Sequence, residues 1–382
     1  MRKTLLLSEI FPPVKGGSGR WFWEVYTRLP AENIVVAAGQ TESAYNFDTT
    51  SPLKTYRLPL SSHSWGLKSK SGLLYYWRVY REVRRLIKNE KIEILHCGRC
   101  LPEGFIGYLI KKLHGIPYIC YIHGEDVETA ATSRELTWIV NKALNGATKL
   151  ICNSQNSARI LLDKWDSPPS KTFVINPGVD ALQFSPATPD ENIKATLNWE
   201  NRNVILTVGR LQERKGHDML MKALPAIVDK FPLTLYAIIG NGEQKEHLKK
   251  LVETLSMEKH VMFMDEINDQ QMIQCYQQCD VFVLPNRTVD NDIEGFGIVL
   301  VEAQACGKPV IAGNSGGTSE TMKINESGFI VDCNTPNELV KKISYLFSYP
   351  DKANEMGKLG RAHVESTLDW KQLIILIKQH FN

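Results

Sequence analysis

Residues 293–302 read IEGFGIVLVE and place two glutamates, Glu294 and Glu302, eight positions apart. Two carboxylates that flank one glycosidic bond can act as general acid and general base, which requires them to lie about 5 to 9.5 Å apart. If all eight steps were helical, the two backbones would be separated by about 12 Å. The spacing therefore argues against a single acid–base pair.

The residues between the two glutamates predict an anion site instead. Four backbone amides lie where the sequence predicts the start of a helix, those of Gly295, Phe296, Gly297 and Ile298. Unpaired N–H groups and the helix dipole favour anions at such a position. The order carboxylate, anion site, carboxylate matches a nucleotide sugar, with hexose hydroxyls at one end, a diphosphate in the middle and ribose hydroxyls at the other.

A second group of charges lies in residues 206–216, LTVGRLQERKG. The pattern predicts a strand that ends at Val208, a turn at Gly209, and a loop that carries Arg210 and Lys215. Two cations beside the carboxyl edge of a strand suit a phosphate or diphosphate, Arg through its planar fork and Lys as a point charge. Taken alone, the motif leaves open that both are ordinary solvated loop charges.

The elements that must position these motifs alternate along the whole chain of 382 residues. Short β-branched runs are followed by longer amphipathic stretches, which predicts βαβ units and parallel sheets. The strands are too numerous for one sheet, and a chain of this length suits two domains. A (β/α)8 barrel alternates in the same way, but would not be expected to show the interruption near the middle of this chain.

That interruption is INPGVDALQFSP, residues 175–186, which contains two prolines and a glycine before a new strand at Asn203. We expect two Rossmann-like domains that face each other across a cleft, the usual ligand site of open α/β folds. The expected ranges are 1–178 for the first domain and 179–363 for the second. A C-terminal helix within 364–382 is expected to cross back to the first domain.

Composition excludes several other classes of protein. The chain is 43% hydrophobic and 23% charged, as soluble globular proteins are, and its net charge of +3 is too weak to imply nucleic acid. No apolar run is long enough for a membrane span, and Ser8 and Glu9 interrupt the N-terminal apolar segment before a signal core is complete. We expect a cytoplasmic protein.

Cysteine usage does not predict a metal centre. The eight cysteines form only two close pairs, Cys97 with Cys100 and Cys275 with Cys279, and no second CxxC completes a tetrahedral zinc site. Buried, reduced thiols are the expectation, because cysteine is usually buried.

Together, the motifs resemble those of family 4 of the GT-B glycosyltransferases, a large retaining group. EGFGIVLVE is similar to its E-x7-E motif, GRLQERKG to its phosphate-binding loop, FPPVKGGSGRW to its N-terminal glycine loop, and YIHGED to the segment with its active-site histidine. PGVDALQFSP, CDVFVLPN and GNSGGTSETM resemble its interdomain segment and the flanks of its donor site. The likeness covers nearly the whole chain in the family's order.

The resemblance implies four catalytic residues, His123, Glu294, Arg210 and Lys215. Glu294 would bind hydroxyls of the donor sugar, and His123 would lie near the transferred sugar. Arg210 and Lys215 would stabilise the departing diphosphate by preorganised charge. An ordinary strand-end histidine is the alternative for His123.

The resemblance also implies further donor-binding residues. Gly16 and Gly17 would let backbone approach the phosphate and the acceptor, Asp126 would orient His123 or the acceptor, and Ile267 would contact the base. The remaining implied donor-site residues are Gly295, Phe296, Gly297, Ile298, Val299 and Glu302. Glu302 would bind the ribose. A flexible turn at the two glycines and a surface charge at Glu302 are the alternatives.

No cofactor is predicted. Asp290 and Asp292 spell D-x-D, which holds a divalent metal in the other large transferase fold, but here they precede the donor helix of a fold that relies on cationic side chains. We predict no required metal, with a metal site as the alternative. GGSGRW is not GxGxxG, and no acidic residue ends the next strand, so NAD is disfavoured.

Residues 65–91 carry eight basic residues against Glu82 and Glu90. Helical spacing places Leu73, Tyr76, Trp77, Tyr80 and Ile87 near one face, and Arg78, Arg81, Arg85 and Lys88 on another. A basic helix with an aromatic face can lie on an anionic membrane. The alternative is a helix whose apolar face is buried and whose exterior is basic.

The sequence thus predicts a retaining, metal-independent transferase that moves a hexose from a nucleotide sugar to a lipid-linked saccharide or polysaccharide precursor. UDP-glucose is the first choice of donor and GDP-mannose the second. The alternatives are an epimerase or a phosphorylase on the same fold, or a nucleotide-sugar sensor without turnover. Partners would be the donor, the acceptor and an anionic membrane surface.

Overall fold

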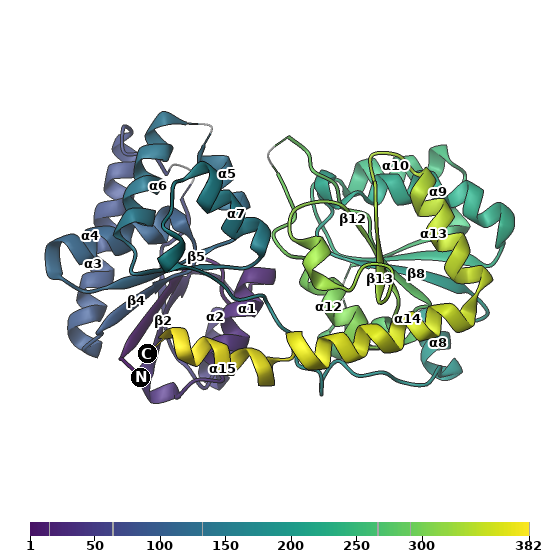
Figure 1. The fold of residues 1–382 in the computed structure, drawn as a ribbon, viewed down its shortest axis with the longest axis horizontal. Coiled ribbons are helices and arrows are strands. Elements are labelled where there is room, and N and C mark those ends of the chain that lie inside the picture. Colours follow the sequence, from purple (N-terminus) through teal and green to yellow (C-terminus); the bar gives the residue numbers. More distant parts are fainter. Residues whose placement is uncertain (15, 63–64, 132, 266, 291, 382) are drawn as a thin grey trace. The chain divides into compact units, whose positions relative to one another are not determined.

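A computed structural model describes residues 1–14, 16–62, 65–131, 133–265, 267–290 and 292–381 (Figure 1). The chain divides into two units by its internal contacts, Met1–Pro177 together with Leu373–Asn382, and Gly178–Gln372. Both are built on parallel sheets, as the alternating sequence pattern predicts.

The first unit contains a seven-stranded sheet in the order β3-β2-β1-β4-β5-β6-β7, with every pair parallel. Its strands are β1 (Thr4–Ser8), β2 (Ile34–Gly39), β3 (Lys54–Leu58), β4 (Ile94–Cys97), β5 (Tyr118–Ile122), β6 (Lys149–Cys152) and β7 (Thr172–Val174). The strand order reverses between β1 and β4, so the carboxyl ends of these two strands flank the topological switch point, where ligands bind in open α/β sheets.

Helices cover both faces of this sheet, with α3, α4 and α6 on one face and α1 and α15 on the other (Figure 1). The helices are α1 (Gly17–Tyr26), α2 (Ala44–Thr50), α3 (Lys70–Glu90), α4 (Phe105–His114), α5 (Glu125–Ala130), α6 (Arg134–Gly146), α7 (Gln155–Lys164) and α15 (Trp370–Phe381). Alternate strand residues face opposite layers: Leu95 belongs to the core under α3, α4 and α6, whereas His96 packs against Phe381 of α15.

The predicted apolar face of residues 65–91 is wrong in part, because helix α3 buries a different set of residues. Its buried residues are Gly72, Tyr76, Val79, Val83 and Leu86. Leu73 and Trp77, which were expected beside Tyr76, are 53% and 56% exposed. The helix presents the stripe through Tyr76, Val79 and Val83 to the sheet, and this rotation leaves Trp77 outside.

The second unit contains a six-stranded sheet in the order β10-β9-β8-β11-β12-β13, again parallel throughout. Its strands are β8 (Asn203–Val208), β9 (Thr234–Ile239), β10 (Val261–Met264), β11 (Val281–Leu284), β12 (Val310–Gly313) and β13 (Gly328–Val331). Here the order reverses between β8 and β11, which places the switch point at the carboxyl ends of those two strands.

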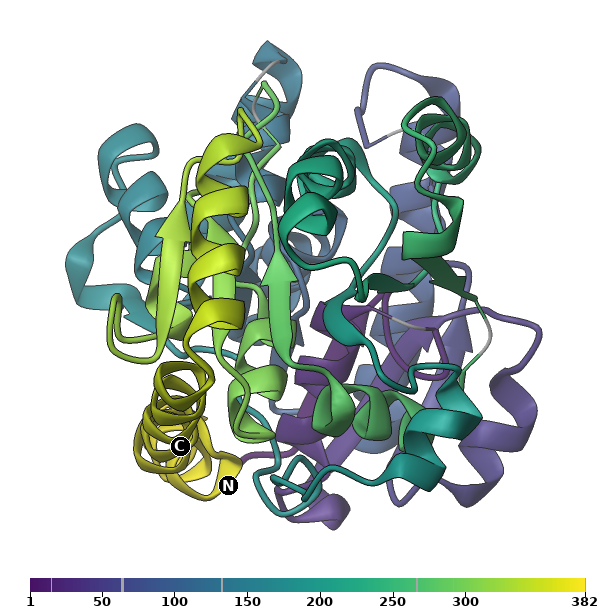
Figure 2. The same cartoon turned by 90° about the vertical axis from the view of Figure 1, so that its right-hand side faces the viewer.

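Two hydrophobic cores lie on the two faces of this second sheet, and Figure 2 shows helices on both sides of it. The helices are α8 (Glu191–Leu197), α9 (His217–Lys230), α10 (Lys245–Thr254), α11 (Asp269–Gln278), α12 (Ile298–Ala305), α13 (Asn337–Ser348) and α14 (Pro350–His363). Helices α11 and α12 pack in one core, and α9, α10 and α13 in the other. Each unit is therefore a three-layer α/β structure of the predicted Rossmann type.

The C-terminal segment rejoins the first unit later than expected. The sequence placed the return at residue 364, whereas the first unit regains the chain at Leu373. Val364 and Leu368 are buried in a core of the second unit, and the backbone of Val179 pairs with Asp369 there. Apolar burial thus keeps the chain in the second unit for nine further residues.

Candidate functional site

The predicted donor motifs meet at the switch point of the second unit. Lys215 ends a short 3-10 turn between β8 and α9, and Glu294 lies in the loop between β11 and α12. Lys215 Nζ lies 2.5 Å from Glu294 Oε2, and the two side chains are only 11% and 10% exposed. Because β8 and β11 are neighbours in the sheet, two loops some 80 residues apart in sequence form one buried ion pair.

Arg214 is the second cation of this site, and sequence reasoning missed it. Its Nη1 lies 2.7 Å from Glu294 Oε2, and its Nε lies 3.0 Å from Asp292 Oδ1. Burial alone would raise the pKa of Glu294, but the charges of Lys215 and Arg214 outweigh it and lower that pKa below its ordinary value. The signal was present in the sequence, since Arg214 directly precedes Lys215 in ERKG.

Asp292 of the D-x-D sequence binds Arg214 in this cluster. Burial raises the pKa of its carboxyl group, and the charge of Arg214 opposes that rise. In the part of the chain that the structure describes, no group of three or more histidine, cysteine or acidic side chains is placed to hold a metal ion. Metal independence stays a prediction from the sequence.

Glycines fix the backbone around the ion pair. Gly216 has φ of 69°, and a Cβ there would lie 1.8 Å from the carbonyl oxygen of Pro285. Gly316 has φ of 59°, and a Cβ there would lie 1.8 Å from the carbonyl oxygen of Glu294. Neither contact tolerates a side chain, so both loops approach as closely as they do only because these positions are glycine.

The helix after Glu294 begins at Ile298, with Gly297 in a left-handed conformation before it. Only the last four of the eight steps from Glu294 to Glu302 are therefore helical, and Val299 lies in the first turn. Glu302 is 2% exposed and accepts a hydrogen bond of 2.7 Å from the Tyr276 hydroxyl. The alternative of a surface charge at Glu302 is wrong, and no pattern in the sequence pointed to Tyr276.

Arg210 and Lys215 occupy different environments, because Arg210 is exposed whereas Lys215 is buried against Glu294. His217 fixes the Arg210 backbone: its Nε2 donates to the Arg210 carbonyl oxygen at 3.3 Å, and its Nδ1 lies 3.0 Å from the Tyr236 hydroxyl. Burial lowers the pKa of His217 to about 4, so the ring is neutral at pH 7. A neutral ring accepts from Tyr236 and donates to the carbonyl, as the geometry requires.

His123 follows β5 at the carboxyl edge of the first sheet. Its ring packs edge-on against Trp21 and Phe22, with centroids 5.8 and 6.0 Å away. Nε2 lies 2.8 Å from the carbonyl oxygen of Gly98. Because a carbonyl only accepts, Nε2 carries a proton, which leaves Nδ1 as the nitrogen that is not engaged by this hydrogen bond.

Asp126 positions the backbone near His123 rather than its ring. Its Oδ1 accepts from the backbone N–H of His123 at 3.2 Å, and its Oδ2 accepts from the backbone N–H of Cys100 at 3.1 Å. One carboxylate thereby ties the loop after β5 to the segment after β4.

The other predicted residues have less distinctive surroundings. Gly16 caps α1 with φ of 168°, an extended conformation that other residues also adopt, and Gly17 begins the helix. Phe296 is 3% exposed within a core of the second unit, and Ile267 is half-buried at the edge of the same core. A role for Ile267 toward the base, and one for the amide of Gly295 toward phosphate, stay predictions.

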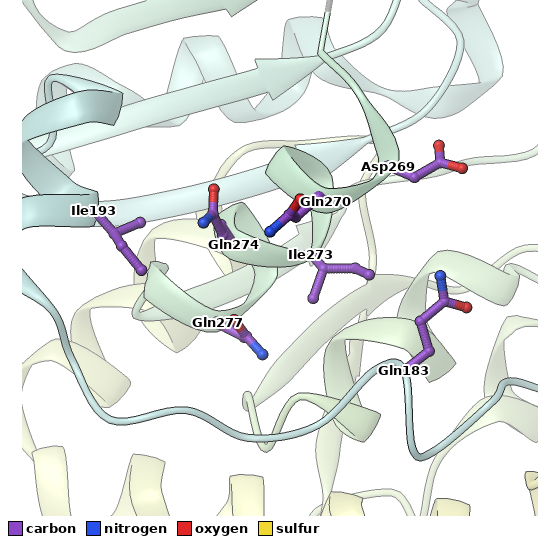
Figure 3. A pocket seen from close by; sticks show the side chains of 7 residues that line it. All are labelled: Gln183, Ile193, Asp269, Gln270, Ile273, Gln274 and Gln277. Carbon is purple, nitrogen blue, oxygen red and sulfur yellow. The ribbon is translucent and has the colours of Figure 1, made fainter.

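A separate pocket of about 540 Å³ lies between α8 and α11. Figure 3 shows its lining, which is Gln183, Ile193, Asp269, Gln270, Ile273, Gln274 and Gln277. No residue predicted to bind the donor lines it. Its single ionisable group is Asp269, which offers no cation for a phosphate.

Comparison with known proteins identifies the fold and the family. The family model "Glycosyltransferase Family 4" matches residues 15–182, and "Glycosyl transferases group 1" matches residues 189–363. Among solved structures, Anabaena HepE in complex with UDP-glucose superposes with a TM-score of 0.83 at 20% identity over 99% of both chains. Sucrose-phosphate synthase of Thermosynechococcus elongatus superposes with a TM-score of 0.82 at 20% identity, over 100% of this chain and 98% of that one. The two sheets are therefore those of a GT-B glycosyltransferase.

Relatives that match over nearly their full length include two mannosyltransferases. One is a "GDP-mannose-dependent monoacylated alpha-(1-6)-phosphatidylinositol monomannoside mannosyltransferase" of Corynebacterium glutamicum, 30% identical over 97% of this chain and 95% of the relative. The other is a "GDP-mannose-dependent alpha-(1-6)-phosphatidylinositol monomannoside mannosyltransferase" of Mycolicibacterium smegmatis, 27% identical over 96% and 95%. The chain belongs to glycosyltransferase family 4 and is a glycosyltransferase.

Proposed function

We propose that this enzyme transfers mannose from GDP-mannose to a hydroxyl of an inositol-containing or saccharide-bearing lipid, with retention and without a metal. The observation that carries the proposal is the buried cluster of Lys215, Arg214 and Glu294 at the switch point of the second unit. Both of the relatives named above are GDP-mannose-dependent, whereas the neighbour bound to UDP-glucose is 20% identical. GDP-mannose therefore replaces UDP-glucose as the first choice of donor.

The second unit supplies the donor site in this proposal. Arg214 and Lys215 are paired with the carboxylates of Asp292 and Glu294, and Arg210, on the same loop, is exposed. Lys215 and Arg210 neutralise the diphosphate as the glycosidic bond breaks. Glu294, held by its two cations, accepts hydrogen bonds from sugar hydroxyls.

The first unit supplies the acceptor site and His123. With Nε2 bound to the Gly98 carbonyl, Nδ1 is the acceptor that the ring offers to a hydroxyl. No side-chain nucleophile is evident, so we assign same-face attack in which the departing phosphate takes the proton of the acceptor hydroxyl. Exclusion of water then limits hydrolysis of the donor.

A panel of GDP-, UDP- and ADP-sugars with mass-spectrometric detection tests the donor. GDP-mannose should be consumed and its hexose found on a phosphatidylinositol or phosphatidylinositol monomannoside acceptor. Glu294→Ala should abolish transfer, and Glu32→Ala, at an exposed site of the first unit, is the matched control. Release of a new sugar nucleotide without acceptor would favour an epimerase, and binding without turnover would favour a sensor.

A lipid acceptor requires access to a membrane, although no helix among the described residues is long and apolar enough to cross one. Helix α3 offers exposed apolar side chains and charge together: Leu73, Leu74 and Trp77 are all more than half exposed, and the helix carries six basic against two acidic residues. Arg81 Cζ lies 4.5 Å from the Trp77 ring. Exposed tryptophan beside cations suits the interface of an anionic bilayer.

Helix α6 extends this surface. Trp138 is 53% exposed, with Lys142 Nζ 5.5 Å from its ring. The two helix starts are tied together, because Glu135 of α6 accepts from the backbone N–H of Leu67 and Lys68, just before α3. We assign the membrane contact to both tryptophans, rather than to a uniformly basic helix.

Vesicle flotation tests this assignment with phosphatidylcholine alone and with 30 mol% phosphatidylglycerol added. Trp77→Ala/Trp138→Ala should weaken binding to anionic vesicles about tenfold or more, because two large apolar groups no longer enter the interface. Tyr45→Ala, at a site 79% exposed on α2, is the matched control. Equal binding by the double variant and the wild type would contradict the assignment.

A further inference from the structure

Three charged residues that have no role in the proposed function form a cluster at the switch point of the first unit. Glu9 is the first residue after β1, and Arg99 is the second after β4. Arg99 Nη2 lies 2.7 Å from Glu9 Oε2, and Arg99 Nε lies 3.4 Å from Glu103 Oε2. Glu103 also accepts from the backbone N–H of Glu9 at 2.9 Å. The guanidinium therefore bridges two carboxylates whose loops come from adjacent strands.

The three side chains differ in access to solvent. Glu103 is 2% exposed, Arg99 is 18% exposed and Glu9 is 26% exposed. Glu103 and Arg99 thus form the buried base of the cluster, and Glu9 forms its outer end. Arg99 engages Oε2 of Glu9, which orients this carboxylate at the carboxyl edge of the sheet.

The cluster lies beside His123. The carbonyl of Gly98 is bound to the ring of His123, and the N–H of Cys100 is bound to Asp126, which also caps the backbone of His123. Both neighbours of Arg99 are therefore fixed to the loop after β5. A molecule that contacts His123 from this edge also meets the side chains that follow β1 and β4.

Charge decides which molecules the cluster can bind. In this cluster one guanidinium stands against two carboxylates, and Asp126 of α5 adds a third acidic group, which accepts from the backbone N–H of Cys100. Arg99 is engaged by Glu9 and Glu103, so an anion such as phosphate would compete with two carboxylates already bound. A charged carboxylate that is partly exposed is, in contrast, a strong acceptor for a neutral hydroxyl donor.

We propose that Glu9, oriented by Arg99 and Glu103, binds a hydroxyl of the neutral sugar or polyol ring of the acceptor and positions that ring beside His123. Glu9 is a specificity-determining residue for the acceptor, and Arg99 and Glu103 are positioning residues. The site rests on the proposed function, because it requires transfer to a hydroxyl. Under this proposal, the phosphate of the acceptor does not bind at this edge of the sheet and lies on another surface.

Glu9→Gln tests the site, because it keeps the size of the side chain and removes the charge. Steady-state kinetics with phosphatidylinositol monomannoside should show an acceptor KM raised about tenfold or more and a kcat within about threefold of wild type. The dissociation constant for GDP-mannose and the slow hydrolysis of donor without acceptor should stay unchanged. Glu32→Gln, on the exposed surface of the first unit, is the matched control.

A second measurement separates ligand contact from a merely structural effect. A series of soluble acceptor glycosides that each lack one hydroxyl is compared with the complete acceptor. For one member of the series, kcat/KM of the wild type should fall about tenfold. For the same member, kcat/KM of Glu9→Gln should fall hardly at all, because the partner of that hydroxyl is already missing. Equal losses with both proteins, or an unchanged acceptor KM in Glu9→Gln, overturn the site. Competition by inorganic phosphate that Glu9→Gln strengthens would also overturn it, because Arg99 would then be the ligand.

Failure of the proposed function gives a different result. If the wild type binds the donor but transfers hexose to no sugar or polyol hydroxyl in the panel, both the function and the Glu9 site are wrong. If the wild type transfers and only the effects at Glu9 are absent, the function stands and the acceptor site lies elsewhere.

Discussion

The ion pair of Lys215 and Glu294 gives the sharpest prediction, because a second substitution should restore part of the lost stability but none of the lost transfer. Lys215→Met removes the cation and Glu294→Gln removes the carboxylate charge, both from side chains about one-tenth exposed. Removing one partner of a buried pair costs about 3 to 5 kcal/mol, since the other charge is left without compensation. Arg214 still binds Glu294 at 2.7 Å, so we expect a loss at or below the lower limit of this range for Lys215→Met, about 2 to 3 kcal/mol.

The double variant separates the two effects. With both charges gone, no uncompensated charge from this pair stays buried, so the free energy of unfolding should recover part of the loss. We expect a coupling of about 1 to 3 kcal/mol between the two sites. Transfer should not recover, because the double variant still lacks the positive charge of Lys215 that neutralises the diphosphate. Loss of one preorganised group at a developing charge lowers kcat about 10² to 10³-fold, or about 2.7 to 4 kcal/mol.

Urea unfolding of the four proteins measures the coupling, and a coupled assay for released GDP measures transfer. Lys222→Met on α9, a site whose lysine is 42% exposed beside Asp218, is the matched control and should change both quantities little. Additive losses of stability would show that the ion pair is not a coupled unit. Transfer near the wild-type rate in Lys215→Met would refute the assignment of the donor site.

Two further predictions concern residues that support the sites. Burial lowers the pKa of His217 from 6.5 to about 4, so its contribution to stability is present above pH 6.5 and is lost as the pH falls toward 4. His217→Gln should therefore flatten the fall of the urea midpoint between pH 6.5 and 4, and it should raise the donor KM. An unchanged slope of the urea midpoint against pH would refute this role. Phe381→Ala should cost about 3 to 5 kcal/mol, because the ring is 3% exposed and packs 4.5 Å from His96. Thermal unfolding measures this loss, and Leu376→Ala, at a more exposed site of the same helix, should lower the melting temperature much less.

Periodicity predicted the two parallel sheets, because each strand carries its own apolar run and the connections must be helical. It did not predict the exposed position of Trp77. Tyr76 and Trp77 are both large and aromatic, and helical spacing places them within one broad stripe. Which of the two enters the core depends on how α3 rotates over the sheet, and in the structure it is Tyr76 that packs edge-on against Phe105 of α4.

The donor motifs were found because their residues are close in sequence, whereas their partners are not. Glu302 binds Tyr276, which lies 26 positions earlier on another helix, and such a pair has no spacing rule. Arg214 was overlooked for a different reason. Adjacent cations in a loop look equivalent in sequence, and only the approach of β11 to β8 decides that Arg214 faces Glu294.

The six strands of the second unit lie in the same order as the first six strands of the first unit, so equivalent positions can be compared. In the second unit, the loop after β8 supplies the cations Arg214 and Lys215, which lie against two carboxylates of the loop after β11 and suit the diphosphate of a donor. Nothing in the fold requires that sign, because the backbone at a switch point only provides space and partly unpaired amides. The sign is chosen by the side chains.

In the first unit, the cluster after β1 and β4 places Arg99 between the carboxylates of Glu9 and Glu103. If this edge bound the donor, its carboxylates would repel the diphosphate that the second unit is built to neutralise. If it bound the phosphate of a lipid, the same repulsion would apply. A neutral sugar or polyol ring is the ligand that suits the carboxylate of Glu9, so the two clusters assign the donor to one unit and the sugar or polyol of the acceptor to the other.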